Sequence, residues 1–407
     1  MHQISGVTKD VIWVGANDRR LKLFENIFPI ANGVSFNSYL VRDEKNVLFD
    51  TVDKSSGGQF LENVAYALNG GTLDYLVVLH VEPDHAALIP EIIRRYPNVK
   101  VVGNARTFTI LKQFFGDGYG LDADGRAVTV GDGESFTTGK HTFKFIYAPM
   151  VHWPEVMTAY DTTDKILFSA DAFGSFGALS GNIFADCYDF EREFADETRR
   201  YYTNIVGKYG PQVAALIKKA GDLDIKYICP LHGPVWRKNL SRIIDRYKLW
   251  AECRPEEKSV LIVYGSVYGG TENAANVFAG ALSALTSGKL RIRVFDVSAT
   301  DVSVLVSEAF RAEYLVLACS TYNAGLYRGM EVFLEDLKAH AFKNRRVALI
   351  ENGSWALSAA NRMKAILADM KTISVTEPTV SFRSALTAQD AQKLFEAAAA
   401  LIADTDN

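Results

Sequence analysis

The chain has 407 residues, too many for one ordinary hydrophobic core, so its length alone predicts two or three domains. Hydrophobic residues make up 48% and charged residues 23%, and a net charge of −4 gives no electrostatic reason to expect nucleic-acid binding. We find no apolar run of membrane-spanning length and no signal-peptide core. The four cysteines form no C-x-x-C pair, which excludes a fused four-cysteine iron or zinc module and predicts a cytoplasmic protein with reduced thiols.

The first 250 residues or so have the pattern of short strands joined by loops and a few helices. We predict strands at 11–14, 38–41, 47–50, 75–79, 99–102, 143–147, 157–161 and 166–169, and helices at 58–67, 90–96, 105–115 and 210–220. Three polar residues come directly after apolar strand segments, namely His80, Asp171 and His232. Loops at strand ends are where a rigid sheet can present side chains to a common point.

Seven potential metal ligands occur in the first 232 residues. They are His80, Glu82, Asp84, His85, His152, Asp171 and His232. The chain has only seven histidines, and four of them belong to this set. A single histidine after a strand is usually a satisfied polar group, but a whole set of this kind requires several independent coincidences. Four imidazoles and three carboxylates have the number and chemical type to hold two metal ions of intermediate hardness.

A charged, proline-containing stretch at 252–258 separates this half from a second with a different rhythm. We predict domains at 1–252 and 258–407. In the second, strands at 260–264, 291–294, 314–318, 347–351 and 373–375 alternate with helices at 272–285, 330–339, 358–370 and 388–403. Such alternation predicts a parallel, doubly wound sheet.

Three loops of the second half follow its predicted strands. They contain Ser266, Val267, Tyr268, Gly269, Gly270 and Thr271, then Ser320, Thr321, Tyr322, Asn323, Ala324 and Gly325, then Asn352, Gly353, Ser354 and Trp355. Backbone amides and hydroxyls at a helix N-terminus can bind a phosphate, although a glycine-rich loop alone is equally typical of a tight turn. Three loops in register predict a flavin mononucleotide (FMN) site at the switch point of a flavodoxin-like sheet. Tyr322 and Trp355 are then candidates to pack near the flavin ring, or else ordinary surface aromatics.

The seven-ligand pattern resembles the metallo-β-lactamase fold, whose binuclear zinc hydrolases carry an H-x-H-x-D-H motif. Here Glu82 stands where that motif has its second histidine. A carboxylate adds charge and a hard oxygen donor, which shifts the preference from zinc toward iron. Three carboxylates and a bridging hydroxide would neutralise two ferrous ions, and seven ligands leave open positions for a gas molecule.

Together the two halves resemble the flavodiiron proteins (A-type flavoproteins), over nearly the whole chain. The fold class implied is a metallo-β-lactamase-like αββα sandwich followed by a flavodoxin-like doubly wound parallel sheet. The resemblance implies that His80, Glu82 and His152 hold one iron, that Asp84, His85 and His232 hold the other, and that Asp171 bridges them. It implies reduction of dioxygen to water, of nitric oxide to nitrous oxide, or of both, with FMN as the immediate electron donor.

The family resemblance also bears on partners. Without a rubredoxin-type C-x-x-C pair the chain resembles the simplest class of the family, so a separate donor such as a rubredoxin or a reduced deazaflavin is expected. A head-to-tail homodimer, or a dimer of dimers, is expected because it sets the flavin of one chain against the diiron site of the other. We expect no nucleic acid and no membrane as partners.

Several alternatives stay open at this point. The chain could be predominantly a nitric oxide reductase, with residues around the ligands such as Phe24, Trp153 or Tyr202 selecting the gas. Other hypotheses are a zinc hydrolase with an attached flavodoxin-like module, a diiron oxygen sensor and a plain electron carrier. Glu82 argues against the hydrolase, the flavin half against the sensor, and the metal ligands against the carrier.

Overall fold

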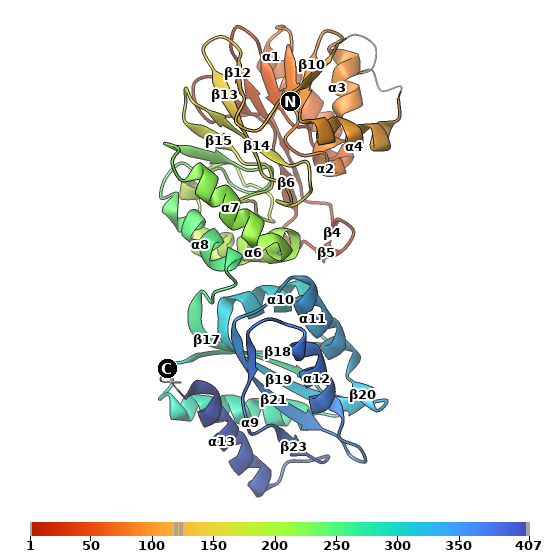
Figure 1. The fold of residues 1–407 in the computed structure, drawn as a ribbon, viewed down its shortest axis with the longest axis vertical. Helices are drawn as coiled ribbons and strands as arrows, with labels where there is room; N and C mark the ends of the chain where they lie inside the picture. Colours follow the sequence, from red (N-terminus) through yellow and green to blue (C-terminus); the bar gives the residue numbers. More distant parts are fainter. Residues whose placement is uncertain (1, 118–120, 122–124, 404–407) are drawn as a thin grey trace. The chain divides into compact units, whose positions relative to one another are not determined.

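The computed structural model describes residues 2–117, 121 and 125–403. The chain forms two compact units, Met1–Lys248 and Leu249–Asn407. Figure 1 colours the first unit from red to green and the second from green to blue. Within the described ranges, no helix is both long enough and apolar enough to cross a lipid bilayer.

Two large sheets make up the first unit as described. The first has the order β1-β2-β7-β8-β9-β10-β11 and the second the order β12-β13-β14-β15-β16. The first contains β1 (Ser5–Gly6), β2 (Val11–Trp13), β7 (Tyr39–Val41), β8 (Val47–Phe49), β9 (Tyr75–Val77), β10 (Lys100–Gly103) and β11 (Ala127–Thr129). The second contains β12 (Ser135–Thr137), β13 (Thr142–Tyr147), β14 (Met157–Asp161), β15 (Ile166–Phe168) and β16 (Tyr227–Cys229). Two small antiparallel sheets of two strands each pair β3 (Ala16–Asp18) with β6 (Val34–Phe36) and β4 (Leu23–Phe24) with β5 (Phe28–Pro29).

The inner faces of the two sheets meet through aromatic side chains. Phe49 of β8 stacks on Phe168 of β15 with ring centroids 4.1 Å apart, and it contacts Phe143 of β13 edge-on at 5.2 Å. All three residues are fully buried. Each ring removes a large apolar area from water, so this contact helps to hold the two sheets face to face.

Helices connect the strands of the first unit. Those between strands of the first sheet are α1 (Gly57–Leu68), α2 (Pro83–Ala86), α3 (Ile89–Arg95) and α4 (Ala105–Phe115). Those that follow β15 and β16 are α5 (Phe190–Glu193), α6 (Ala195–Tyr201), α7 (Gly210–Ala220) and α8 (Ser241–Ala251). Of these, α2, α5, α6 and α8 have no counterpart among the predicted elements, while α1, α3, α4 and α7 lie within one residue of their predicted bounds.

The second unit contains a mostly parallel sheet of the order β18-β17-β19-β21-β22. Its strands are β17 (Glu257–Gly265), β18 (Arg291–Asp296), β19 (Ala312–Tyr322), β21 (Arg345–Asn352) and β22 (Ile373–Val375). Two short strands lie off this path: β20 (Gly325–Leu326) pairs with β19, and β23 (Val380–Phe382) pairs with β21 in parallel. Since β17 has neighbours on both sides that follow it in the chain, the connections run outward in two directions from it.

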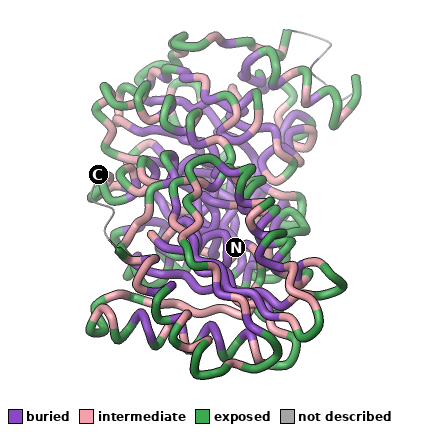
Figure 2. Tube along the Cα trace, turned by 60° about the horizontal axis from the view of Figure 1, so that its bottom comes forward, coloured by how far each residue is buried: buried purple, intermediate pink, exposed green. Residues whose placement is uncertain are grey.

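Helices cover both faces of this sheet, as the alternating pattern predicts. On one face α10 (Val302–Arg311), α11 (Arg328–Ala339) and α12 (Ala359–Ala368) contribute Phe310, Phe333 and Met363 to one buried cluster. On the other face α9 (Gly270–Leu285) and α13 (Ala388–Ile402) contribute Phe278 and Leu394 to a second. Figure 2 shows buried residues along the strands and exposed residues along loops and outer helix faces. Helix α10 and strands β20 and β23 were not among the predicted elements.

Candidate metal centre and flavin cleft

Three of the seven candidate ligands lie three residues beyond the end of a strand. His80 follows β9, Asp171 follows β15 and His232 follows β16 at this spacing. Strands β15 and β16 are parallel neighbours whose last residues, Phe168 and Cys229, are paired. Asp171 and His232 therefore start from the same edge of the second sheet.

Helix α2 presents the next ligands. It is a single turn in which Glu82 is the N-cap residue, Pro83 fills the first helical position, and Asp84 and His85 follow. Proline suits this position because the first amides of a helix have no intrahelical partner. The turn places Asp84 and His85 close behind Glu82, and His152 comes from the loop between β13 and β14.

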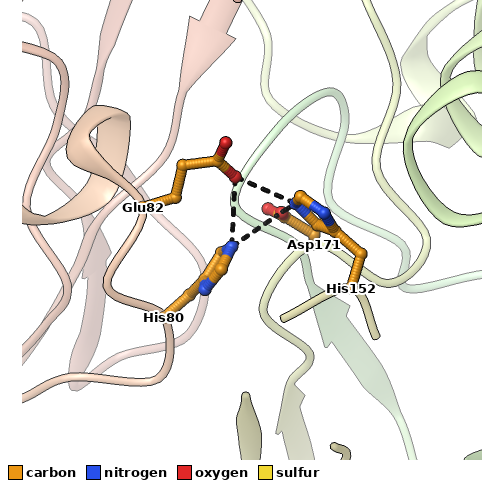
Figure 3. A group of neighbouring side chains, drawn as sticks. All are labelled: His80, Glu82, His152 and Asp171. Carbon is orange, nitrogen blue, oxygen red and sulfur yellow. Dashed lines mark hydrogen bonds and ion pairs between the residues drawn. The ribbon is translucent and has the colours of Figure 1, made fainter. Parts of the chain in front are cut away.

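The first set of side chains contains His80, Glu82, His152 and Asp171. Figure 3 shows their ring nitrogens and carboxylate oxygens pointing toward one another. The Glu82 Oε2 atom lies 3.2 Å from His80 Nε2 and 2.9 Å from His152 Nε2. The Asp171 Oδ2 atom lies 3.4 Å from His80 Nε2 and 3.2 Å from His152 Nε2.

The second set contains Asp84, His85 and His232. The Asp84 Oδ2 atom lies 3.4 Å from His85 Nε2 and 3.2 Å from His232 Nε2. The other oxygen of Asp171, Oδ1, lies 3.2 Å from His85 Nε2 and 3.8 Å from His232 Nε2. The two oxygens of Asp171 thus face the two sets separately.

The donor atoms fit a pair of metal ions. Ligand atoms about 2.1 Å from an ion lie roughly 3.0–3.4 Å from each other, close to the spacings found here. His80, His85, Asp171 and His232 are at most 1% exposed. Asp84 Oδ2, Asp171 Oδ1 and the Nε2 atoms of His85 and His232 are buried without a hydrogen-bond partner in the described part of the chain. Buried polar atoms are normally satisfied, so these atoms fit a site that holds cations.

The pKa values of the ligand side chains also indicate that the site favours positive charge. Burial opposes the charged form of His152, but hydrogen bonds with Asp171 and Glu82 raise its pKa to about 9. Burial likewise opposes ionisation of Asp171, yet the nearby charge of His85 and a hydrogen bond with His152 hold its pKa well below its usual range. The carboxylates therefore keep a positive partner near them, a role that metal ions would take.

Three residues were named from the sequence as possible gas selectors, and two of them contact the candidate ligands. The Phe24 ring lies 5.2 Å from that of His232, and the Trp153 ring lies 5.4 Å from that of His80. Tyr202 instead packs on Tyr247, with ring centroids 4.9 Å apart. Its neighbour Tyr201 lies 5.5 Å from His232, but α6, on which Tyr201 lies, was not predicted.

The second unit contains a cleft of about 690 Å³ at the carboxyl ends of its strands. Most of the predicted flavin residues line it: Ser266, Val267, Tyr268, Gly269, Gly270, Ser320, Thr321, Tyr322, Asn323, Asn352, Gly353, Ser354 and Trp355. Ala324 and Gly325 do not line it, and Thr271 is buried below the loop, where its Oγ1 lies 2.7 Å from Ser320 Oγ. Asn273, Ser384, Ala385 and Leu386 line the cleft without having been predicted. The last three follow β23, so recognising that strand would have identified their loop.

Backbone crowding shapes this cleft. A Cβ atom on Gly353 would lie 1.9 Å from the Ala356 carbonyl oxygen, and one on Gly270 would lie 2.5 Å from the Ser384 carbonyl oxygen. Gly270 is also the first residue of α9. The glycines therefore let the loops pack closely, and the free amides at the start of α9 face a site suited to a phosphate.

Comparison with known proteins gives the family. Residues 34–233 match the family described as ODP family beta lactamase. The rubredoxin oxygen:oxidoreductase from the anaerobe Desulfovibrio gigas is similar in structure, with a TM-score of 0.90, 26% identity and 98% coverage of each chain. The flavodiiron protein from Giardia intestinalis has a TM-score of 0.89 at 23% identity, covering 98% of this chain and 96% of that one. The anaerobic nitric oxide reductase flavorubredoxin of Aeromonas hydrophila is 30% identical over 366 residues, which are 89% of this chain and 72% of that protein. The chain belongs to the flavodiiron protein family.

Membership in the flavodiiron family confirms two predictions made from the sequence, the family itself and the fold class. The metallo-β-lactamase-like fold corresponds to the two-sheet unit, within which the matched residues 34–233 lie. The flavodoxin-like fold corresponds to the parallel sheet with helices on both faces.

Proposed function

We propose that this chain is a flavodiiron oxidoreductase that reduces dioxygen to water, nitric oxide to nitrous oxide, or both. It is an enzyme of the oxidoreductase class, and its cofactors are FMN and a pair of non-haem irons. Relatives named for each gas support both substrates, one as an anaerobic nitric oxide reductase and the other as an oxygen oxidoreductase. The observation that carries the proposal is Asp171, whose two oxygens face two separate sets of ligands.

The residues assigned to the irons follow from this division. His80, Glu82 and His152 hold one iron, and Asp84, His85 and His232 hold the other, while Asp171 bridges them. Each set pairs imidazole nitrogens with a carboxylate, a donor set of intermediate hardness that suits iron. When bound, the irons and the flavin together supply the electrons that the gas takes up.

The burial of the ligands decides from which side a gas molecule arrives. His80, His85 and Asp171 are shut away from solvent, whereas the side chains of Glu82 and Asp84 are 13% and 14% exposed. His152 is also slightly exposed. The side of the site that is open to solvent therefore lies at Glu82, Asp84 and His152. The fully buried imidazoles line the opposite side of the metal positions.

The cleft of the second unit holds the flavin. The phosphate of FMN binds at the loop from Ser266 to Gly270 and at the start of α9, where backbone amides and the Ser266 hydroxyl face the cleft. Tyr322 and Trp355 pack near the ring. Both are exposed on the free chain, Trp355 by 78%, so they are available to contact a ligand or a second protein.

The remaining partners follow from the same proposal. Electrons come from a separate donor, such as a rubredoxin or a reduced deazaflavin. Two chains assemble head to tail, so that the flavin of one faces the irons of the other. The exposed aromatic residues Tyr268, Tyr322 and Trp355 around the cleft support such a contact, because a partner would cover them. All four cysteines are unpaired, three of them buried, which supports a reducing, cytoplasmic location.

Metal and flavin content test the cofactors first. We expect about two irons and one FMN per chain, by elemental analysis and by flavin absorbance after release. Anaerobic consumption of dioxygen and nitric oxide by the reduced protein then tests the activity. Zinc-rich protein that lacks flavin and consumes neither gas would contradict the proposal and favour the hydrolase hypothesis.

Complementation tests the assembly. Chains carrying His85→Ala are mixed with chains carrying Gly353→Ala, after dissociation and reassociation. Mixed dimers regain one intact pair of flavin and iron sites, so part of the activity returns. Proven mixed dimers without recovered activity would show that electrons pass within a single chain.

A further inference from the structure

Glu155 is a buried carboxylate outside the set of seven ligands. It lies between the ligand His152 and strand β14, and it is 1% exposed. Its Oε1 atom lies 2.7 Å from His80 Nδ1 and also accepts the backbone N–H of Val81 at 3.1 Å. Its own carbonyl oxygen accepts a hydrogen bond from Asn104 Nδ2 at 2.5 Å. The carboxylate and its backbone are therefore both fixed in place.

This contact determines how His80 presents its ring. The Nε2 atom of His80 faces Glu82 and Asp171, whereas Nδ1 faces Glu155. A carboxylate at Nδ1 accepts the N–H there, so the lone pair stays on Nε2, where a metal would bind. A buried negative charge at this position also makes the Nε2 atom of the imidazole a stronger ligand for a metal ion.

No carboxylate is hydrogen-bonded to an Nδ1 atom of His85 or His232 among the described residues. The buried carboxylate of Asp50 interacts with the charge of His85, but its Oδ1 atom accepts backbone N–H groups, those of Leu79 and His80, rather than an imidazole N–H. His232 Nδ1 lies 2.9 Å from the backbone carbonyl oxygen of Ser35, which is neutral. His85 Nδ1 is buried and has no hydrogen-bond partner among the described residues. Glu82 and Asp84 supply one carboxylate to each set, and Asp171 is shared. Glu155 adds a further carboxylate that is hydrogen-bonded directly to a ligand imidazole, that of His80.

We propose that Glu155 is a positioning residue that makes the two metal positions unequal, so that the position held by His80, Glu82 and His152 is the one that favours the ferric state. This inference rests on the proposed diiron function. A negative charge behind a ligand stabilises the higher charge of the ion that the ligand holds. With the irons bound, an added one-electron oxidant would therefore take its electron preferentially from the iron that His80 holds, next to Glu155.

The test uses the full-length protein loaded with ⁵⁷Fe. In Glu155→Gln, the side chain keeps its shape and an amide oxygen that can accept from Nδ1, but it loses the charge. Mössbauer spectra of the ferrous protein show which iron signal the substitution changes. A redox titration gives the midpoint of the first oxidation step. We expect one signal to change, the midpoint to move to higher potential, and the ferric fraction after one-electron oxidation to become less one-sided.

Asp161→Asn is the matched control. Asp161 is a fully buried carboxylate 2.8 Å from His141 Nδ1, which is the same kind of pair at a place in the first unit outside the ligand set. The control should fold, load two irons and keep the wild-type midpoint. A wild-type midpoint and ferric distribution in Glu155→Gln with two irons bound would overturn the proposal.

Metal affinity provides the test if Glu155→Gln does not retain iron. Zn²⁺ is titrated against a chromophoric chelator, and we expect one of two sites to weaken about 10- to 100-fold while the other is unchanged. Equal weakening of both sites, or of neither, would overturn the inference. Wild-type protein that binds no metal pair at all would instead contradict the proposed function, so the two failures can be told apart.

Discussion

The candidate metal centre and the flavin cleft are built in opposite ways. The metal centre uses side chains, and four of its seven residues are at most 1% exposed. The cleft uses backbone, tight glycines and side chains such as Tyr268, which is 99% exposed. A buried charged side chain must have a partner of opposite charge or a hydrogen-bond partner. The residue type at each buried position of the metal centre is therefore tightly constrained. A loop that offers amides imposes fewer demands on side-chain identity.

Asp171→Ala should give the largest effect at the metal centre, which is built from side chains. The substitution removes the oxygens that face both sets and leaves four imidazoles with two carboxylates. Since loss of a residue that only supports a metal ligand typically costs about 10- to 100-fold, loss of a shared ligand should lower both gas-reducing activities by at least about 100-fold. Iron content should fall, while FMN content stays at one per chain.

Asp164→Asn is the control for Asp171→Ala, because Asp164 lies outside the ligand set and accepts a hydrogen bond from the Thr8 hydroxyl at 2.5 Å. It should retain both irons. Wild-type turnover and two irons in Asp171→Ala would show that Asp171 is not the bridge.

The backbone side of the comparison is tested by Gly353→Ala. The new Cβ would lie 1.9 Å from the Ala356 carbonyl oxygen, so the loop between β21 and α12 must move. We expect FMN affinity to fall by at least about 10-fold, which corresponds to roughly 1.4 kcal/mol of lost loop geometry. Fluorescence titration of the flavin measures this, and iron content should not change.

Gly280→Ala is the matched glycine control, since a Cβ there meets no atom within 4 Å. It lies inside α9, where alanine should stabilise the helix by about 0.5–1 kcal/mol. Unchanged FMN affinity in Gly353→Ala would mean that the loop does not shape the flavin site.

The same contrast accounts for how much of the site could be predicted from the sequence. The seven candidate ligands were identified because four histidines and three carboxylates in this order rarely occur together by chance, and the structure brings all seven into two adjoining sets. Glu155 was missed because nothing in the sequence shows that the segment after His152 returns to the Nδ1 side of His80. Thr271 was assigned to the cleft from its place in the loop, but the first turn of α9 directs it toward Ser320.

Strand prediction had a similar limit. The apolar runs of β17, β19 and β21 were recognised, and each extends further at its ends than predicted. Strand β23 has three residues, as the predicted β22 does, but it follows β22 closely and forms by pairing in parallel with the same strand, β21. A long-range pairing of this kind leaves no local signal in the sequence. Three cleft residues, Ser384, Ala385 and Leu386, were lost with β23.

A third group of polar residues lies outside the candidate metal centre and contains the buried His141 and Asp161 with the half-buried Asp164. His141 Nδ1 lies 2.8 Å from Asp161, and Nε2 lies 3.6 Å from Asp10, which also pairs with Lys140. Asp43 accepts the His141 backbone N–H at 2.8 Å. Burial would lower the pKa of His141, but the hydrogen bond and charge of Asp161, with Asp164 and Asp43, raise it overall.

This raised pKa makes stability depend on pH. The charge of His141 contributes fully below its unfolded pKa of about 6.5, and the contribution is lost as pH rises through the higher folded pKa. His141→Gln should therefore destabilise the protein at pH 6 by about 1–3 kcal/mol, and the gap to wild type should narrow toward pH 9. Urea unfolding across this range measures the gap. A gap that stays constant with pH would show that the pKa of His141 is the same in the folded and unfolded states.

Trp355 gives the smallest expected effect and the finest test of the comparison. It is 78% exposed at the cleft, so the free chain gains little from burying it, but it can stack on a bound flavin ring. An aromatic contact of this kind contributes about 0.5–1.5 kcal/mol, so Trp355→Ala should weaken FMN binding about 2- to 10-fold, and Trp355→Phe should recover part of the loss. Phe395→Ala on α13 removes a 40% exposed ring that is not part of the cleft lining, and it should leave FMN affinity unchanged. Equal FMN affinity in Trp355→Ala and wild type would mean that the loops hold the flavin through backbone groups and not through this ring. The flavin cleft would then rely on backbone where the metal centre relies on side chains.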